Sequence, residues 1–361
     1  MLELTRQRIE QYLSALEGRA VRVHALSRLD RPSSEEVKFY GYGVPIRVSY
    51  QPEGRPRRTA VLHTISPGPF GHEDMADRAQ ELLWQHRAFN RLPRHVRSLD
   101  VGGIKHGGAV VPLGDVEEFA LLTRYAEGEN YARDLDRLLQ TGKLTDLDVS
   151  RADALCDYLA EIHRVRGTDP GLYVRRIREL IGHGQCIMGL IDSYPPGGPV
   201  AAEFLEEIER RALSWRWKLK KLSHRLRQVH GDFHPWNILF ASDVQFQVLD
   251  RSRGEYGDPA DDVTCLCMNY VFFSLRHGGK LEGCWQELFL RFWRRYLERT
   301  GDQEMLQVAA PFLVFRCLVM AHPIWYPALA AGVREKLIAF SLAVLERDWF
   351  DPEQVNAYCG A

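Results

Sequence analysis

The sequence lacks an excess of charge of either sign. Its 361 residues include 47 Lys and Arg against 48 Asp and Glu, which gives a formal net charge of -1 at pH 7. A nearly neutral chain has no overall electric field that would draw it to nucleic acid or to an anionic membrane, so any charge-driven recognition must be local. We therefore predict neither a nucleic-acid partner nor a membrane partner.

Long apolar runs and cysteines are also scarce. The most apolar stretch, residues 312–320, contains Arg316 and is far shorter than the roughly 20 residues that a membrane span needs. Seven cysteines at irregular spacing do not resemble the dense, paired frameworks of secreted domains. The first residues have amphipathic helical spacing, with Ile9, Leu13 and Leu16 on one face, rather than an apolar signal core. These observations predict a cytoplasmic protein with reduced thiols.

The composition that remains is that of a folded globular protein. Hydrophobic residues make up 45% of the chain and charged residues 26%, which excludes disordered and fibrous classes. At roughly 150 residues per domain, the length predicts two domains.

The pattern along the chain changes once. Residues 21–29, 44–50 and 57–65 are predicted strands, residues 72–90 a helix, and the stretches VVPL (110–113) and EEFALLTRY (117–125) are expected to complete an antiparallel sheet of about five strands. From Gly128 onward, helical patterns dominate. We predict an α+β fold with a β-rich N-terminal lobe, residues 1–123, and a helical C-terminal lobe, residues 124–361.

One β-like stretch, residues 228–263, interrupts the helical lobe. Residues 238–240 and 244–250 flank a short turn and predict a hairpin, with Asn237 roughly opposite Val248. Asn237 and Asp250 then meet at the open end of the hairpin, where their oxygens suit a magnesium ion that also binds phosphate. Asp232, on the preceding loop, is placed to accept a proton from an attacking hydroxyl.

Each of these residues also has an ordinary structural explanation. An Asp at a strand end is often a helix cap, and an Asn after Trp is often a turn residue. It is the combination, at one spacing and inside a helical lobe, that favours a functional site.

The two segments HGDFHPWNILF and VLDRSRGEYGDPADDV resemble the catalytic and metal-binding segments of the aminoglycoside phosphotransferase and choline kinase-like superfamily, which has a bilobal protein kinase-like fold. The resemblance implies that Asp232 is the catalytic-loop aspartate, that His230 packs and orients that loop, and that Asn237 and Asp250 hold Mg²⁺. It also implies that Asp261 supports the loop from below. The implied reaction moves the γ-phosphate of ATP, or another nucleoside triphosphate, to a hydroxyl group of a small molecule.

In the N-terminal lobe, the resemblance implies further nucleotide contacts. Gly41 and Gly43 would lie on a loop over the phosphates, although a turn between strands needs no nucleotide. Backbone groups of Arg124 and Ala126 would meet the adenine at the hinge between the lobes.

The third predicted strand departs from the family pattern, because His63 stands where the family has a lysine that binds phosphate. An unperturbed imidazole is only partly charged at neutral pH, but a neighbouring triphosphate favours its charged form. Glu81 is the candidate partner of His63, with Glu73 as a rival. The alternative is that His63 is an ordinary strand residue and that another base, such as Arg57, binds the phosphate.

Other features have competing explanations. The basic run at residues 210–227 fits nucleic-acid binding, but we favour a solvated helix face whose tryptophans pack inward. His230 and His234 have a zinc-like spacing that Pro235 makes improbable as a helix. Trp325 and Tyr326 belong to the core or line an acceptor pocket. The rival functions are a nucleotide-binding regulator without turnover and a kinase that acts on a protein side chain.

Overall fold

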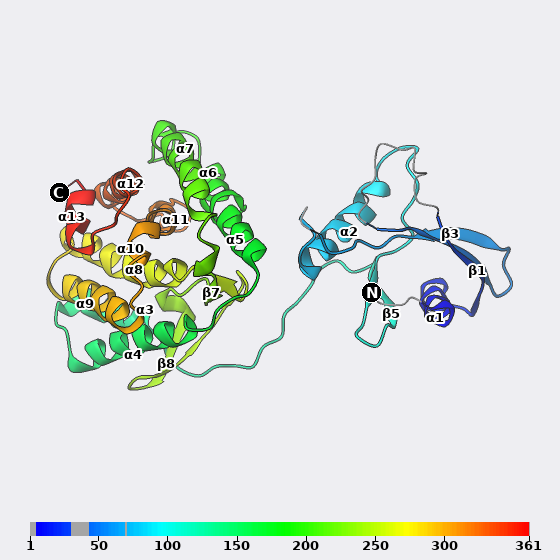
Figure 1. Cartoon of the computed structure of the whole chain (residues 1–361), viewed down its shortest axis with the longest axis horizontal. Helices are drawn as coiled ribbons and strands as arrows, with labels where there is room; N and C mark the ends of the chain where they lie inside the picture. The colour runs from blue at the N-terminus through cyan, green and yellow to red at the C-terminus, as the bar shows by residue number, and fades with distance from the viewer. Residues whose placement is uncertain (1–4, 30–42, 69–70, 361) are drawn as a thin grey trace. The chain divides into compact units, whose positions relative to one another are not determined.

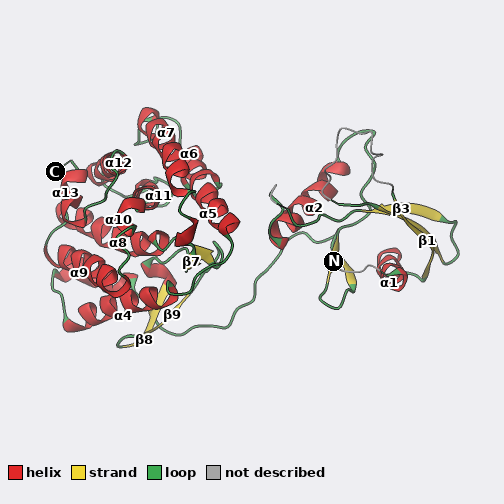
Figure 2. Cartoon of the chain, in the orientation of Figure 1, coloured by secondary structure: helices red, strands yellow, loops and turns green. Residues whose placement is uncertain are grey.

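The computed structural model describes residues 5–29, 43–68 and 71–360. The chain divides into two compact units, Met1–Thr123 and Arg124–Ala361. Strands and two helices make up the described part of the first unit, whereas helices dominate the second (Figure 2). The predicted α+β class is therefore confirmed.

The first unit is built on a three-stranded antiparallel sheet of order β1-β2-β3. Valines alternate on β1, so that Val21 and Val23 face the same side and are buried with Tyr50 of β2 against Leu13 of the first helix. The elements of this unit are α1 (Arg6–Glu17), β1 (Val21–Arg28), β2 (Ile46–Pro52), β3 (Arg58–Leu62), α2 (Met75–Phe89), β4 (Gly102–Ile104) and β5 (Val110–Pro112).

The prediction of a single sheet of about five strands is wrong for the described residues. Strands β4 and β5 pair with each other in a separate two-stranded sheet, and residues 117–125 form no strand. Leu121 and Leu122 are 90% and 97% exposed. The apolar composition of this segment suggested a strand, but a strand also needs a neighbour to pair with, and the described residues provide none.

The second unit contains a larger helical core. Helix α8 is buried along most of its length and packs on α3, α9 and α11 (Figure 1). Its helices are α3 (Ala132–Thr141), α4 (Asp146–Ile162), α5 (Pro170–Gly182), α6 (Ile187–Ser193), α7 (Ala202–Leu219), α8 (Ala260–Gly278), α9 (Gly283–Thr300), α10 (Met305–Val308), α11 (Ala310–Ala321), α12 (Ala331–Leu345) and α13 (Val355–Tyr358), with short 3-10 turns η1 (Ser223–Arg225), η2 (Pro235–Asn237) and η3 (Pro352–Gln354). In the part of the chain that the structure describes, no helix is both long and apolar enough to span a membrane.

The short strands of the second unit position the loop that carries the predicted chemistry. They are β6 (Glu129–Asn130), β7 (Arg227–Gln228), β8 (Ile238–Ser242), β9 (Gln245–Val248) and β10 (Tyr256–Gly257). The predicted hairpin is present as β8 and β9, with Ile238 opposite Val248. Asn237 therefore faces Leu249 rather than Val248, and its carbonyl accepts a hydrogen bond from the Leu249 N–H at 2.8 Å.

Candidate active site

The loop between β7 and β8 is held from beneath by one buried carboxylate. Asp262, at the start of α8, accepts the backbone N–H groups of His230 and Gly231, each at 2.7 Å. Its Oδ2 also lies 3.1 Å from Nε2 of His163 on the α4 side. Gly231 has φ +88°, a conformation that glycine adopts without strain and that turns both N–H groups toward one acceptor.

This geometry corrects one expectation from the sequence. The acid that supports the loop is Asp262, whereas Asp261 points to a different partner, Arg316. Burial alone would raise the pKa of Asp262, but the His163 side chain and the loop N–H groups outweigh it and lower that pKa. The two adjacent aspartates begin the same helix, and a residue's position on the helix decides which side it faces.

Asp232, the predicted catalytic aspartate, is anchored through one of its two oxygens. Arg316 of α11 donates from Nη1 to Asp232 Oδ1 at 2.7 Å, and Arg253 Nη2 lies 3.8 Å from the same oxygen. The other oxygen, Oδ2, lies 3.7 Å from His234 Nε2. Burial would raise the pKa of Asp232, but the two guanidinium groups more than offset burial, so the pKa lies below its ordinary value. Asp232 is thus an ionised carboxylate with Oδ2 left as its less engaged acceptor.

Arg316 links this aspartate to a second acid. Its Nη2 donates to Asp261 Oδ1 at 2.5 Å and to the Gly231 carbonyl at 3.3 Å, and its side chain is only 5% exposed. For Asp261, burial is the largest influence and raises the pKa despite the guanidinium. One buried cation therefore fixes the carboxylate, the loop carbonyl and the helix start relative to one another.

Asn237 and Asp250 are the residues predicted to hold a metal ion. The Asn237 side chain donates from Nδ2 to the Asp232 carbonyl at 3.1 Å, which turns its amide oxygen away from that contact. Asp250 follows β9, is exposed, and makes no hydrogen bond or ion pair with any other described residue. An unengaged carboxylate beside a fixed amide oxygen fits a hard cation that takes its remaining ligands from phosphate and water. Within the described ranges there is no cluster of three or more His, Cys, Asp or Glu side chains arranged for a metal.

His230 is buried beneath the loop rather than directed at solvent. Its Nδ1 accepts the Asp232 N–H at 3.3 Å, and its ring packs edge-on against Phe233. Its Nε2 is buried without a hydrogen-bond partner in the described part of the chain. The His230 ring thus contacts the backbone of Asp232 and the ring of Phe233, and its predicted role in orienting the loop stays a prediction.

The predicted nucleotide contacts of the first unit are only partly described. Gly41 lies outside the described residues. A Cβ on Gly43 would lie 2.0 Å from the Thr64 carbonyl oxygen, so close backbone packing alone requires glycine there. His63 follows β3, is exposed, and makes no hydrogen bond or ion pair with a described residue. Glu81 accepts from Gln85 at 2.8 Å, and a contact between Glu81 and His63 stays a prediction.

Arg124 and Ala126 lie at the start of the second unit, in the irregular segment before β6. Arg124 is exposed and Ala126 is partly buried. Their predicted backbone contacts with adenine stay untested.

Sequence reasoning missed four residues of this site: Asp262, His163, Arg253 and Arg316. For Arg316 a signal was present, because a single arginine in the most apolar stretch of a chain must be paired if that stretch is buried. Its partner lies 84 residues earlier and no spacing rule identifies it.

The expectation for the basic run is only half correct. Trp215 is buried and donates to the Leu345 carbonyl at 3.0 Å, but Trp217 is 59% exposed, with Lys220 over its ring. Near the C-terminus, Tyr326 packs edge-on against Phe272, whereas Trp325 is exposed.

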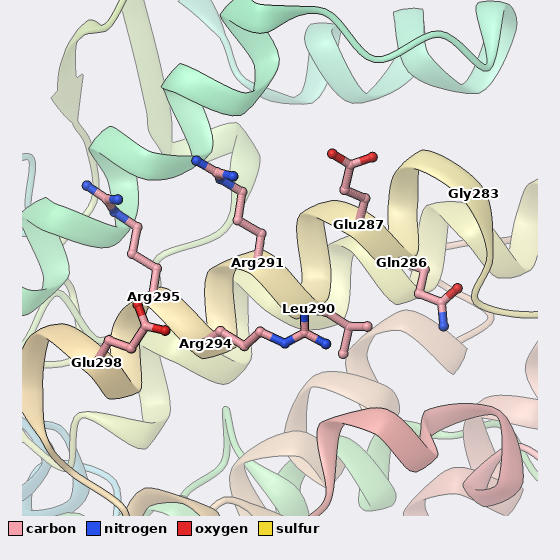
Figure 3. A pocket seen from close by; sticks show the side chains of 8 residues that line it. All are labelled: Gly283, Gln286, Glu287, Leu290, Arg291, Arg294, Arg295 and Glu298. Carbon is pink, nitrogen blue, oxygen red and sulfur yellow. The ribbon is translucent and has the colours of Figure 1, made fainter.

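One cavity of the described residues lies away from the loop that carries Asp232. It has a volume of about 640 Å³ and runs along one helix, α9 (Figure 3). Arg291 and Arg295 on this helix point toward α4, where they are paired with Asp153 and Asp157 at 2.7 Å. This groove is part of the ion-pair network that joins α4 to α9.

Comparisons with known proteins identify the family of the chain. A family model described as phosphotransferase enzyme family matches residues 76–298, well over half of the chain. A search of curated proteins gave no match.

Several solved structures are similar to this chain. One is an amicoumacin kinase in complex with AMP-PNP and Ca²⁺, with 13% identity, 91% of each chain covered and a TM-score of 0.41. Another is a glucosamine kinase in complex with glucosamine, ADP and inorganic phosphate, with 16% identity, 89% of this chain and 82% of that chain covered, and a TM-score of 0.39. A third is a Plasmodium vivax ethanolamine kinase, with 10% identity, 93% of this chain and 80% of that chain covered, and a TM-score of 0.35. All three TM-scores are below 0.5, so the assignment of the chain rests on the family match.

Proposed function

Because the chain belongs to the phosphotransferase enzyme family, we propose that it transfers the γ-phosphate of ATP, or of another nucleoside triphosphate, to a hydroxyl group of a small molecule. Family membership confirms the resemblance carried by the loop motif. The observation that supports the specific proposal is the state of Asp232, an ionised carboxylate held by Arg316 through Oδ1.

In this proposal, Asp232 orients the acceptor hydroxyl and receives its proton. The acceptor approaches Oδ2, because Oδ1 already accepts from Arg316 and faces Arg253. The transition state of phosphoryl transfer is loose, so the hydroxyl needs correct placement more than early deprotonation. A carboxylate with a lowered pKa is suited to this task, since it stays ionised while it positions the hydroxyl.

Asn237 and Asp250 are the residues that would hold Mg²⁺. When bound, this ion neutralises charge on the β- and γ-phosphates. The amide of Asn237 is held by its hydrogen bond to the Asp232 carbonyl. This contact fixes the position of the proposed metal ligand Asn237 relative to the proposed base Asp232.

The acceptor is proposed to be neutral or anionic rather than a polycation. The cationic side chains that contact Asp232 are Arg316 and Arg253, and the neighbouring acid Asp261 is paired with Arg316. A polycationic acceptor would meet like charge at this loop.

Turnover tests the proposal and separates it from the rival functions. The full chain is incubated with Mg²⁺, labelled ATP and a pool of cellular metabolites, beside an Asp232→Asn variant and an Asp348→Asn control on the far, exposed C-terminal segment. We expect label on a small molecule with wild type and control, and a loss of about 10²–10⁴-fold with Asp232→Asn. Label on protein alone would favour a protein kinase. Nucleotide binding with equal, negligible transfer by all three proteins would favour a regulator.

A further inference from the structure

A second cavity of the helical unit has no role in the proposed reaction. It has a volume of about 440 Å³, and its lining includes the cationic side chains of Arg164, Arg166, Arg225, Arg227 and Arg299. Its inner wall includes His163, which contacts Asp262, the carboxylate that holds the catalytic loop. The cavity is therefore separated from the loop by these two side chains.

Arg166 and Arg227 face each other directly within this cavity. They form an antiparallel bridge, flanked by hydrogen bonds from Gln228 N–H to the Val165 carbonyl and from Gly167 N–H to the Leu226 carbonyl. Arg166 and Arg227 are thus a non-hydrogen-bonded antiparallel pair, in which the two side chains lie on the same face and closer together than in a hydrogen-bonded pair. Like charges in that position destabilise a fold.

The neighbouring acids compensate these arginines only in part, since Asp302 and Asp258 raise the pKa of Arg227 by less than burial and the other arginines lower it. Arg164, Arg166 and Arg227 form no ion pair with any residue in the described ranges, and the Arg227 guanidinium donates only to the carbonyls of His224 and Leu226. Burial and then repulsion by Arg166 and Arg225 lower the pKa of Arg227.

The acids that do line the cavity are already occupied. Asp302 and Glu304 both accept from Arg225, at 2.7 and 3.2 Å, and Glu304 also faces His224 at 2.8 Å. Arg225 itself is held from behind by Asp258 at 2.8 Å. Arg299 on the rim is paired with Asp157 at 3.0 Å. Arg164, Arg166 and Arg227 are therefore the cationic side chains of this cavity that have no ion-pair partner among the described residues.

We propose that this cavity binds a small anion that carries a phosphate group. The volume lies within the range of small-ligand sites, and arginine guanidinium groups bind phosphate oxygens with paired, charge-assisted hydrogen bonds. Arg227 is partly buried, whereas Arg164 and Arg166 are exposed and accessible to an anion. An anion between Arg166 and Arg227 converts their mutual repulsion into two attractive contacts. Without a ligand, the repulsion between Arg166 and Arg227 lowers the stability of the fold, and a bound anion removes that repulsion. Substitution of one of these arginines should therefore raise the stability of the unliganded protein and weaken anion binding.

Calorimetric titration of the full chain with inorganic pyrophosphate tests binding without any need for turnover, so its outcome is independent of the proposed function. We expect Arg166→Gln and Arg227→Gln each to weaken pyrophosphate binding by about tenfold or more. Arg210→Gln removes an exposed arginine of α7, paired with Glu207, and is expected to leave the affinity unchanged. Asp250→Asn is expected to leave it unchanged as well, which separates this cavity from the proposed nucleotide site.

Thermal unfolding provides the second readout. Without ligand, Arg166→Gln should raise the unfolding temperature, because it removes the opposed like charge. With saturating pyrophosphate, the wild type should gain more than the variant. A purely structural Arg166 would instead lower the unfolding temperature on substitution.

Three results would overturn the proposal: equal pyrophosphate affinity in wild type and in both cavity variants, an equal loss of affinity with Arg210→Gln, or an unfolding temperature lowered by Arg166→Gln. Tighter binding of single-stranded DNA than of pyrophosphate, with a steep salt dependence that the same two variants reduce, would also overturn it in favour of a polyanion surface.

Discussion

Arg316 and Asp232 form a buried ion pair across 84 residues of sequence, with Arg316 Nη1 2.7 Å from Asp232 Oδ1. The pair joins the loop that carries Asp232 to α11, which lies beyond residues 76–298 that match the phosphotransferase family. The position of the proposed base therefore depends on a helix that the family match does not cover.

Replacement of Arg316 by Met should reduce both stability and turnover. Asp232 and Asp261 would be left facing each other without their shared cation, and loss of one partner from a buried pair costs about 3–5 kcal/mol of unfolding free energy. We expect kcat to fall more than the KM for nucleotide rises, since the base is displaced while the metal ligands remain. Arg316→Lys, which restores one charge but not two directed donors, should recover stability more than kcat.

Chemical denaturation and steady-state kinetics of the same preparations check this. Arg276→Met, an exposed arginine over Phe272 and Phe273 of α8, serves as the control. Unchanged kcat in a folded Arg316→Met variant would show that Asp232 needs no anchor.

The two adjacent acids at the start of α8 should behave differently on substitution. Asp262→Asn replaces an acceptor of two loop N–H groups by a side chain with a single oxygen, so one buried donor loses its partner at a cost of about 1–3 kcal/mol. Asp261→Asn removes only one of the two acids on Arg316 and should be milder. Hydrogen exchange of the peptide that contains His230 and Gly231 is the direct measurement, with faster exchange expected for Asp262→Asn. If Asp261→Asn instead gave the faster exchange, the support of the loop assigned here would be wrong.

The part of the site that could be predicted from sequence is the part that is contiguous in sequence. Asp232, Asn237 and the β8–β9 hairpin lie within twenty residues of one another, so local turn and strand rules bring them together. The choice between Asp261 and Asp262 could not be made this way, because both lie in the first turn of α8 and a rotation about the helix axis separates them. The strand prediction for residues 117–125 is wrong for a different reason. The local sequence is apolar enough for a strand, but a strand forms only where another strand is available to pair with it.

Long-range electrostatic contacts were beyond sequence rules altogether. The basic residues of 210–227 are contiguous in sequence, yet the fold gives them different partners. Arg211 contacts Glu207 and Glu346, Arg225 contacts Asp258, and Arg227 enters the second cavity. Only the bridge between residues 166 and 227 brings Arg166 against Arg227.

The proposed role of Asp250 as a metal ligand predicts that its substitution raises the Mg²⁺ concentration needed for nucleotide binding. Asp250→Asn removes a carboxylate that no described residue engages, so folding should be nearly unchanged while the Mg²⁺ requirement for nucleotide binding rises at least about tenfold. Titration of Mg²⁺ against a fixed nucleotide concentration measures this. Asp243→Asn, in the turn of the same hairpin, is the matched control. An equal Mg²⁺ requirement in Asp250→Asn and wild type would remove Asp250 from the proposed metal site.

His63 predicts a pH dependence of nucleotide affinity. If its charged form binds phosphate, affinity should strengthen as the pH falls from about 8 to about 6, because acid favours an imidazolium over a neutral imidazole. His63→Ala should abolish the change, and His63→Lys should give tight, nearly pH-independent binding, since lysine stays charged. Affinity measured at both pH values for the three proteins decides this. A His63→Ala variant with the affinity and pH profile of wild type would transfer the phosphate contact to another residue such as Arg57.

Asp258 should govern the acid stability of the helical unit. It is buried and accepts from Arg225 at 2.8 and 2.9 Å, from the Tyr173 hydroxyl at 2.8 Å and from the Ala260 N–H at 2.9 Å. Burial would raise the pKa of Asp258, but Arg225 and the other donors lower it below its ordinary value of 3.8. A lowered pKa means that the unfolded chain binds the proton more readily, so this contribution to stability is present above about pH 4 and is lost as the pH falls below that value.

Asp258→Asn should therefore be less stable than wild type at neutral pH, by about 3–5 kcal/mol for a broken buried pair, and should lose less of its remaining stability between about pH 5 and pH 3. Unfolding midpoints across that range, with Asp243→Asn as an exposed control, measure the slope; equally steep acid destabilisation of Asp258→Asn and wild type would assign the acid sensitivity to other carboxylates.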